Sequence, residues 1–167
     1  VIVVDNAPEV SAVDIFKRAY PDVKVVISER NVGFAGGNNL GIRQAKGKYC
    51  YFLNNDTVLN ESSISPLVDR LQAKIKLGAI SPQLVYHNLP EGLQYAGMSA
   101  INAVTGRNKT VGKGQIRSSF KSDFYRTAYT HGAAMMVRTS VIQEVGYMSE
   151  DYFLYYEELD WCERFAQ

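Results

Sequence analysis

Side chains that could bind a metal gather where an apolar run ends. Asn54, Asn55 and Asp56 follow the run at 51–53 directly, with no glycine to mark an ordinary turn. A carboxylate there can hold Mg²⁺ or Mn²⁺, because Mg²⁺ in particular takes few protein oxygens and completes its shell with water and substrate phosphates. Turn formation is the competing interpretation, since Asn and Asp bond readily to nearby backbone.

A second group of acids lies near the end of the chain, in the stretch YYEELDWCER. On a helix, Glu157 and Asp160 share a face, whereas Glu158 can point from the helix start into a cleft. Acids clustered in a partly closed site raise one another's pKa, which suits a general base. The alternative is that acids are simply favoured at a helix N-terminus.

A third candidate is the stretch SERNVGFAGGNNLG, which leads into a helix expected over residues 37–46. Its glycines fit neither G-x-G-x-x-G nor the phosphate-binding G-x-x-x-x-G-K-[ST], so a dinucleotide oxidoreductase is disfavoured. What the stretch offers is a backbone that a flat ligand can approach closely, followed by a helix N-terminus that favours anions.

The elements that must position these groups alternate along the chain. This order predicts an α/β fold with an open, mostly parallel twisted sheet flanked by helices. Ligands bind off the carboxyl ends of the strands in such a sheet, where Asp5, the 31–39 loop and residues 54–56 would meet. Residues 86–128 lack a sustained period and predict a long excursion with short hairpins. Strands are expected at 1–4, 23–27, 49–53, 79–85 and 129–137, and helices at 11–20, 37–46, 64–75, 140–145 and near the C-terminus.

Composition bounds the class of protein. A length of 167 residues and a charged fraction of 21% indicate one soluble globular domain. The net charge of +1 argues against general affinity for nucleic acid or membrane. No apolar run approaches the roughly 20 residues of a membrane span, and Cys50 and Cys162 are expected as buried thiols. The chain begins on an apolar strand without Met, so we expect a fragment.

Five stretches, taken together and in order, resemble a known family. They are VIVVDNA, NVGFAGGNNLGI, YFLNNDTVL, HGAAMMVR and YFLYYEELDWCER, and they resemble family 2 glycosyltransferases with the GT-A fold, with a rhamnosyltransferase-like bacterial subgroup as one option. The resemblance covers nearly the whole chain and is weakest across 86–128. It implies a single GT-A-like domain over 1–167 that lacks the family's first strand and helix and its C-terminal end.

The resemblance also implies an activity. The family transfers a sugar from a nucleotide diphosphate-sugar donor to an acceptor hydroxyl with inversion, and this subgroup suggests bacterial surface polysaccharide synthesis. Expected partners are the donor and a saccharide or lipid-linked saccharide acceptor, with no nucleic acid and no membrane span in this chain. The implied location is cytoplasmic, with peripheral contact to the inner face of the membrane left open.

Roles on the donor side follow from the matched motifs. Asp5 matches an aspartate that contacts the nucleotide base, and the 31–38 segment matches the loop that lines the nucleoside. Asp56 matches the metal-binding end of a D-x-D motif, with Mg²⁺ or Mn²⁺ as the expected cofactor. The first aspartate of that motif is Asn54 here, which removes one charge. The donor-binding residues expected in full are Asp5, Asn31, Gly36, Asn38, Asn54 and Asn55.

Roles at the reacting centre are implied in the same way. Glu158 falls on the second position of the family's E-D motif and is the expected base, with Asp160 as the second choice. His131, Gly132 and Glu157 are expected to face the donor sugar or the acceptor. The base position carries Glu rather than Asp, which is one methylene longer.

Two alternatives remain open on sequence grounds. One is a non-catalytic glycosyltransferase-like fragment or nucleotide-binding module, and another is a nucleotidyltransferase, which also uses acidic metal sites. Within the glycosyltransferase interpretation, the basic residues of 107–126, including Arg117 and Lys121, are hypothesised to hold a phosphorylated acceptor or the donor diphosphate. Their competing role is a solvated loop.

Overall fold

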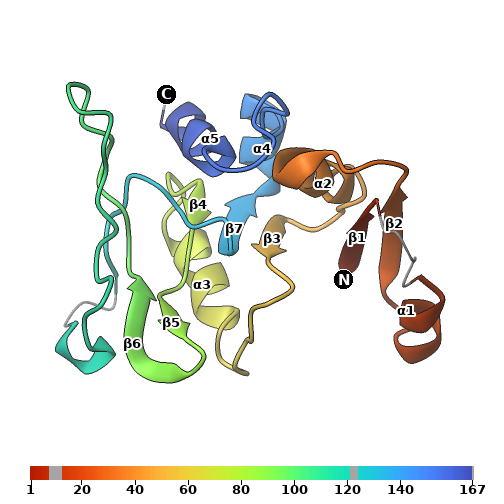
Figure 1. The fold of residues 1–167 in the computed structure, drawn as a ribbon, viewed down its shortest axis with the longest axis horizontal. Helices are drawn as coiled ribbons and strands as arrows, with labels where there is room; N and C mark the ends of the chain where they lie inside the picture. Colours follow the sequence, from red (N-terminus) through yellow and green to blue (C-terminus); the bar gives the residue numbers. More distant parts are fainter. Residues whose placement is uncertain (8–12, 121–123, 167) are drawn as a thin grey trace.

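A computed structural model describes residues 1–7, 13–120 and 124–166 (Figure 1). Its elements are β1 (Ile2–Asn6), α1 (Val13–Ala19), β2 (Lys24–Ser28), α2 (Gly33–Ile42), β3 (Tyr49–Leu53), α3 (Ser65–Ala73), β4 (Ala79–Ile80), β5 (Leu84–Tyr86), β6 (Leu89–Tyr95), the 3₁₀ turn Arg117–Ser119, β7 (Ala134–Arg138), α4 (Thr139–Val145) and α5 (Glu157–Phe165). The predicted alternation of strands and helices is confirmed. The expected first helix begins at residue 11, which lies outside the described residues.

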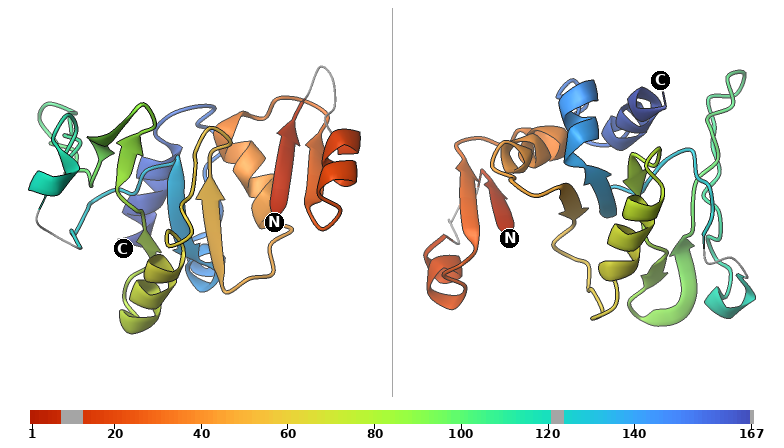
Figure 2. Two further views of the ribbon diagram at one scale, coloured as in Figure 1. Left: turned by 90° about the horizontal axis from the view of Figure 1, so that it is seen from below. Right: turned by 180° about the vertical axis from the view of Figure 1, so that it is seen from behind.

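The strands form three hydrogen-bonded groups with mixed directions. β1 and β2 are parallel, with Ile2 opposite Lys24, whereas β7 runs antiparallel between β3 and β4, and β5–β6 is an antiparallel hairpin. Among the described residues the sheet is therefore mixed rather than mostly parallel. The reason is that the 86–128 excursion returns the chain to the edge where β3 and β4 end, so β7 starts there and runs back (Figure 2).

This arrangement brings the start of β7 beside the end of β3. Leu53 lies opposite Ala134, and the Asn54 amide donates a hydrogen bond of 3.0 Å to the Ala133 carbonyl. Two segments about 80 residues apart in the chain, the 54–56 turn and residues 131–133, are thereby fixed at one edge.

The core lies on both faces of the β3–β7 pair. Cys50 and Phe52 point to one face, as the two-residue period of a strand requires, and pack there with α2, α4 and α5 around the fully buried Trp161. Tyr49 and Tyr51 point to the other face, where α3 packs. The rings of Phe52 and Trp161 meet edge to face at 5.5 Å. Both cysteines are free and buried, as predicted.

Figure 1 shows how these layers are arranged along the molecule. β1, β2 and α1 lie at one end, and the β5–β6 hairpin with the following excursion lies at the other. The helices α2, α4 and α5 lie along one side between them, and Figure 2 shows the same order from behind. No helix within the described ranges has the length and apolar character needed to cross a membrane.

Two elements differ from their predicted bounds for local reasons. The strand expected over 79–85 divides into β4 and β5 around Pro82, which has no amide hydrogen to donate to a ladder. Helix α2 begins at Gly33, four residues before the expected start at Gly37. Side chains outside the helix satisfy its first turn, and these side chains belong to the candidate site.

Candidate active site

Asn6, the last residue of β1, ties that strand to the start of α2. Its Nδ2 donates to Asn31 Oδ1 (3.1 Å) and to the Gly33 carbonyl (3.0 Å), and its Oδ1 accepts the Val32 amide at 3.1 Å. Asn31 Oδ1 also accepts the Gly33 amide at 3.0 Å. Amides at a helix start have no partners within the helix, so these two asparagines supply them. Asn6 thereby shapes the loop in which Asn31 was predicted to bind the donor.

Asn6 is absent from the residues that the sequence predicts for the site. The neighbouring Asp5, which was predicted to bind the donor, is half-buried and lies opposite Ile27 in the strand pair. Because successive strand residues alternate, its side chain points to the other face of β1. A signal was available in the sequence: Asn6 is the first side-chain amide after the apolar run at 1–4.

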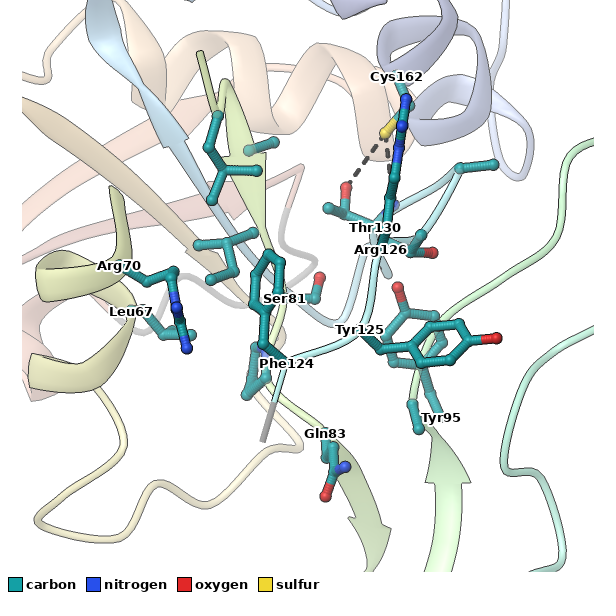
Figure 3. A pocket seen from close by; sticks show the side chains of 18 of the residues that line it. Leu67, Arg70, Ser81, Gln83, Tyr95, Phe124, Tyr125, Arg126, Thr130 and Cys162 are labelled. Atoms are coloured by element: carbon teal, nitrogen blue, oxygen red, sulfur yellow. Dashed lines mark hydrogen bonds between the residues drawn. The ribbon is translucent and has the colours of Figure 1, made fainter. Parts of the chain in front are cut away.

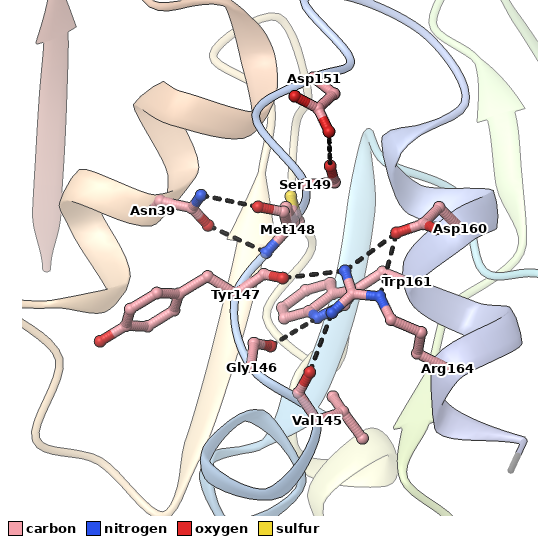
Figure 4. A network of polar contacts seen from close by, with 10 residues as sticks. All are labelled: Asn39, Val145, Gly146, Tyr147, Met148, Ser149, Asp151, Asp160, Trp161 and Arg164. Atoms are coloured by element: carbon pink, nitrogen blue, oxygen red, sulfur yellow. Dashed lines mark hydrogen bonds and ion pairs between the residues drawn. The ribbon is translucent and has the colours of Figure 1, made fainter.

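Helix α2 uses its own asparagines for structure. Asn38, predicted to bind the donor, donates from Nδ2 to the Phe34 carbonyl one turn earlier at 2.9 Å. Asn39 is 1% exposed, and its amide both donates to the Met148 carbonyl (2.9 Å) and accepts the Met148 amide (3.1 Å), as Figure 4 shows. Gly36 is buried in the first turns, where an added Cβ would lie 2.8 Å from Val32.

The Asn54-Asn55-Asp56 segment forms a turn that exposes its tip. The Asn54 carbonyl accepts the Thr57 hydroxyl at 2.6 Å and the Thr57 amide at 3.2 Å, while Asn55 and Asp56 are exposed. The turn chemistry considered from the sequence is therefore present. It leaves Asp56 accessible to a ligand.

The donor groups at this turn suit only an ion that a substrate helps to bind. No cluster of three or more His, Cys, Asp or Glu side chains that could hold a metal occurs in the part of the chain described. The turn offers one carboxylate, Asp56, and the adjacent amide oxygens of Asn54 and Asn55. Mg²⁺ or Mn²⁺ fits such a set when a diphosphate and water supply the remaining ligands.

Two adjacent carboxylates begin α5. Glu157 is 3% exposed and Glu158 is half-buried, and in each the Oε2 atom is buried with no hydrogen-bond partner among the described residues. Burial raises the pKa of Glu157, and it raises the pKa of Glu158, to which the neighbouring Glu157 charge adds. A partly desolvated carboxylate with a raised pKa is a good proton acceptor.

The Glu158 carboxylate lies close to Gly132, which precedes β7 and has no side chain. A Cβ placed on the buried Gly132 would lie 3.7 Å from Glu158 Oε1 and 3.4 Å from the Phe34 ring. Phe34 belongs to α2, Gly132 precedes β7 and Glu158 belongs to α5, so three elements converge on one point. This convergence includes two of the predicted site residues, Gly132 and Glu158.

His131, next to this point, is held in one orientation. Its Nδ1 accepts the Ala133 amide at 3.1 Å, so the proton of the neutral ring is on Nε2, and its own amide donates to the Ser81 hydroxyl at 3.0 Å. The ring packs edge-on against Tyr95, with centroids 5.1 Å apart. Burial lowers the pKa of His131, which favours the neutral ring.

Asp160 is engaged elsewhere. Its Oδ2 accepts Arg164 Nε at 3.0 Å, and the same guanidinium donates to the carbonyls of Val145 (2.9 Å) and Tyr147 (2.8 Å) (Figure 4). Trp161 Nε1 adds a bond to the Gly146 carbonyl at 2.9 Å. Asp160 thus helps join α5 to the segment after α4, while Glu158 meets Gly132.

A cavity of about 360 Å³ has none of the predicted site residues in its lining (Figure 3). Ser81 and Tyr95, which contact His131, are part of its lining, as are Thr130, Cys162 and Arg126.

Of the basic excursion, Arg117 is exposed in its 3₁₀ turn and Lys121 lies outside the described residues.

Comparisons with known proteins identify the family and the fold of the chain. Residues 1–146 match the family described as Glycosyl transferase family 2. The chain is 26% identical over 158 residues to the low-salt glycan biosynthesis hexosyltransferase Agl10 of Haloferax volcanii. That match covers 87% of this chain and 47% of Agl10, so the chain spans about half the length of this relative.

Solved structures show the same fold. GalNAc-T7 with UDP, GalNAc and Mn²⁺ superposes with a TM-score of 0.75 at 16% identity, over 98% of this chain and 34% of that one. The mannosyltransferase PcManGT from Pyrobaculum calidifontis, in complex with GDP-Man and Mn²⁺, superposes with a TM-score of 0.65 at 17% identity. That match covers 99% of this chain and 42% of PcManGT. TarS 1–349 of S. aureus superposes with a TM-score of 0.65 at 15% identity, over 98% of this chain and 44% of that one.

These similarities confirm the predicted GT-A architecture. The family match extends over residues 1–146 of the 167 and includes the turn at Asp56 and the segment at His131. The chain belongs to glycosyl transferase family 2.

Proposed function

We propose that this chain transfers a sugar from a nucleotide diphosphate-sugar to an acceptor hydroxyl, with inversion at the anomeric carbon. The observation that carries the proposal is the meeting of Glu158, Gly132 and Phe34 at the edge where the Asp56 turn begins. A half-buried proton acceptor thereby lies at the same edge as an accessible carboxylate. The complexes of similar folds with UDP or GDP-Man and Mn²⁺ support this type of donor.

Glu158 is the proposed catalytic base. The acceptor oxygen attacks the anomeric carbon from the face opposite the diphosphate, forming the glycosidic C–O bond while the bond to the diphosphate oxygen breaks. Glu158 takes the proton that the acceptor hydroxyl loses. Its partly desolvated carboxylate has a raised pKa, which brings it closer to the neutral range in which a base is most effective.

Asp56, with the amide oxygens of Asn54 and Asn55, would hold Mg²⁺ or Mn²⁺ on the donor diphosphate. When bound, the ion neutralises charge on the leaving group. The exposed position of Asp56 at the turn tip allows its carboxylate to meet a ligand from solvent. The Mn²⁺ complexes of the similar structures support a divalent ion here.

The remaining predicted residues are proposed to position the substrates. Asp5, Asn31, Gly36 and Asn38 belong to the side of the edge formed by β1 and α2, where the nucleoside is proposed to lie. His131 has Nε2–H available to donate to a sugar or phosphate oxygen, because Nδ1 is occupied by the Ala133 amide. Gly132 is proposed to keep the backbone free of a side chain where Phe34 and Glu158 meet, and Glu157 to adjust the charge there.

The proposed biological setting is glycan assembly. The relative Agl10 is named for glycan biosynthesis in an archaeon, which supports this process in general. We extend the proposal to bacterial surface polysaccharide synthesis, with a saccharide or lipid-linked saccharide acceptor, in the cytoplasm and peripheral to the inner face of the membrane.

The test is the turnover of Glu158→Gln, measured as release of nucleoside diphosphate from a panel of nucleotide sugars and acceptors. Turnover should fall about 10²–10⁴-fold, as for loss of a positioned base, while calorimetric binding of the nucleotide diphosphate stays unchanged. Asp160→Asn should retain most of the turnover, because that carboxylate pairs with Arg164. Glu144→Gln, on the exposed side of α4, is the matched control.

Full turnover in Glu158→Gln would contradict the assignment of the base. Nucleotide binding without turnover for any donor in the panel would instead favour the alternative of a non-catalytic nucleotide-binding module. The two measurements therefore separate the role of Glu158 from the activity of the chain.

A further inference from the structure

The five residues before α5 are all aromatic or aliphatic, and all are exposed. We call residues 152–156, with the sequence Tyr-Phe-Leu-Tyr-Tyr, the aromatic rim. Tyr155 is 70% exposed and Tyr156 is 63% exposed, and the other three are also exposed. Single exposed apolar residues are common on protein surfaces, but a run of this kind marks an interaction site.

The backbone of the rim is strained at its two outermost tyrosines. Tyr155 has φ of 71° and Tyr156 has φ of 73°, in the left-handed region that glycine and asparagine usually occupy. A segment selected for stability alone would carry Gly or Asn at these positions and polar side chains at this exposure. Two tyrosines that violate both preferences point to a functional demand on their rings.

The rim joins the two sides of the candidate site. The Phe153 carbonyl accepts the Phe34 amide at 2.8 Å, which attaches the rim to the first turn of α2. At its other end the Tyr156 carbonyl accepts the Asp160 amide at 2.9 Å, and Glu157 and Glu158 follow directly. The exposed rings therefore lie on the short stretch of chain between the contact with α2 and the proposed base.

The charge around the rim selects the kind of ligand. Residues 150–163 contain six acids and no basic residue; the acids are Glu150, Asp151, Glu157, Glu158, Asp160 and Glu163. Glu150 and Asp160 are ion-paired with Arg43 and Arg164, and Glu157 is buried. The charge next to the rim is therefore carried by the exposed Asp151 and the half-buried Glu158, which disfavour phosphate groups and anionic lipid headgroups. An uncharged ligand with an apolar face remains, and a pyranose ring presents such a face through its axial C–H groups.

We propose that Tyr155 and Tyr156 stack against an uncharged sugar ring of the acceptor and so orient its hydroxyl toward Glu158. This inference rests on the proposed function, because it uses Glu158 as the group that meets the acceptor. The donor is excluded as the stacked partner, since its nucleotide is proposed to lie along β1 and α2 and its diphosphate at Asp56. The two tyrosines are thus positioning residues that choose the acceptor.

The experiment is saturation-transfer difference NMR on the chain with UDP or GDP and Mg²⁺. The probes are the methyl α- and β-glycosides of glucose, galactose, mannose and rhamnose. The double variant Tyr155→Asn/Tyr156→Asn removes the rings while placing a residue that tolerates positive φ. The double variant Tyr155→Phe/Tyr156→Phe keeps the rings, and Tyr20→Asn removes a tyrosine of matched exposure, 60%, at the end of α1.

We expect at least one glycoside to receive saturation from the wild-type chain. Its affinity should fall about tenfold in the Asn double variant, a typical loss for an aromatic contact, and should persist in the Phe and Tyr20→Asn variants. The Asn variant should unfold at a temperature no lower than the wild type, because the strain is relieved. A purely structural role for the rim would lower that temperature instead.

Three outcomes would overturn the inference. One is a wild-type chain that binds none of the glycosides, and another is glycoside binding that survives in the Asn double variant. The third is sedimentation of the wild type, but not the Asn variant, with vesicles of phosphatidylethanolamine and phosphatidylglycerol, which would make the rim a membrane contact. If UDP and GDP also fail to bind, the proposed function fails as well; if either nucleotide binds, only the inference on the rim fails.

Discussion

At the scale of single residues, the informative feature is a pair of neighbouring carboxylates with different surroundings. Glu157 is buried and Glu158 is half-buried beside Gly132, and burial raises the pKa of both. The ionised Glu157 contributes further to the raised pKa of Glu158. A base must be deprotonated to act, so turnover should rise with pH through the raised pKa of Glu158.

Glu157→Gln tests this coupling. Removing the Glu157 charge lowers the pKa of Glu158, so the rising limb of the pH–rate profile should move to lower pH. Burial keeps the pKa of Glu158 above its ordinary value in the variant as well. The measurement is kcat/KM against pH for the wild type and the variant, with Glu163→Gln as an acidic control on the same helix. A rising part of the pH–rate profile at the same pH in both proteins would show that the charge of Glu157 does not affect the pKa of Glu158.

The same shifts determine how stability depends on pH. Because the folded-state pKa values of Glu157 and Glu158 are raised, the folded chain holds protons that the unfolded chain has released. Their contribution to stability is therefore fully present below the ordinary Glu pKa and is lost as pH rises through the raised values. Glu157→Gln should reduce this loss, which denaturant unfolding at a series of pH values would reveal.

At the scale of elements, the periodic segments were predictable and the junctions were not. The apolar runs predict β1, β2 and β3, and the stripe around Leu67 and Leu71 predicts α3, because burial on one face leaves a direct pattern in the sequence. The start of α2 depends on bonds from Asn6, 27 residues before Gly33. Such a contact has no local signature, so the helix appears in the sequence to begin only at Gly37.

The candidate site divides in the same way. The positions of Asp56 after β3 and of Glu158 at the start of α5 were predictable, because a carboxylate at a strand end or helix start is a local pattern, and their roles remain proposals. The pairing of Asp160 with Arg164, and the intrahelical bond of Asn38, follow from the direction in which each side chain leaves its helix. The antiparallel direction of β7, which brings His131 to the end of β3, follows from the path of the 86–128 excursion. That path leaves no periodic signal.

The junction of α2 with the aromatic rim provides a prediction at this scale. Gly33 has φ of 73°, and a Cβ there would lie 2.2 Å from the Phe153 carbonyl oxygen. Gly33→Ala therefore adds a clash with backbone to the cost of the left-handed conformation, and should destabilise the chain by more than about 2 kcal/mol. Gly106→Ala is the matched control, since Gly106 has φ of 64° and nothing within 4 Å of the added Cβ.

Urea unfolding of the two variants separates the two costs. Gly106→Ala should lose only about 1 kcal/mol, the typical cost of the left-handed region for alanine. The difference between the variants then measures how firmly the rim is held against α2. Equal losses would show that the rim moves aside freely, and that its contact with Phe34 does not fix it beside the site.

At the scale of the whole molecule, packing stabilises the fold, and the proposed ligands would complete the site. The core around Trp161 joins α2, α4 and α5 to the β3–β7 pair, and no cluster of three metal-ligating side chains occurs among the described residues. Binding of a ligand to the folded state alone raises stability by RT ln(1 + [L]/Kd), about 2.7 kcal/mol at a hundredfold excess over Kd. A divalent ion should therefore contribute only through the nucleotide.

Thermal unfolding with and without ligands tests this division. Chelation by EDTA should leave the Tm of the ligand-free chain unchanged, and Mn²⁺ alone should change it little. UDP or GDP with Mn²⁺ should raise the Tm, and Asp56→Ala should remove that rise without altering the Tm of the ligand-free chain. Glu61→Ala, which removes an exposed carboxylate outside the proposed site, should keep the rise. A Tm that falls on chelation alone would place a metal in the fold itself and remove Asp56 from its proposed role as the ligand that depends on a bound diphosphate.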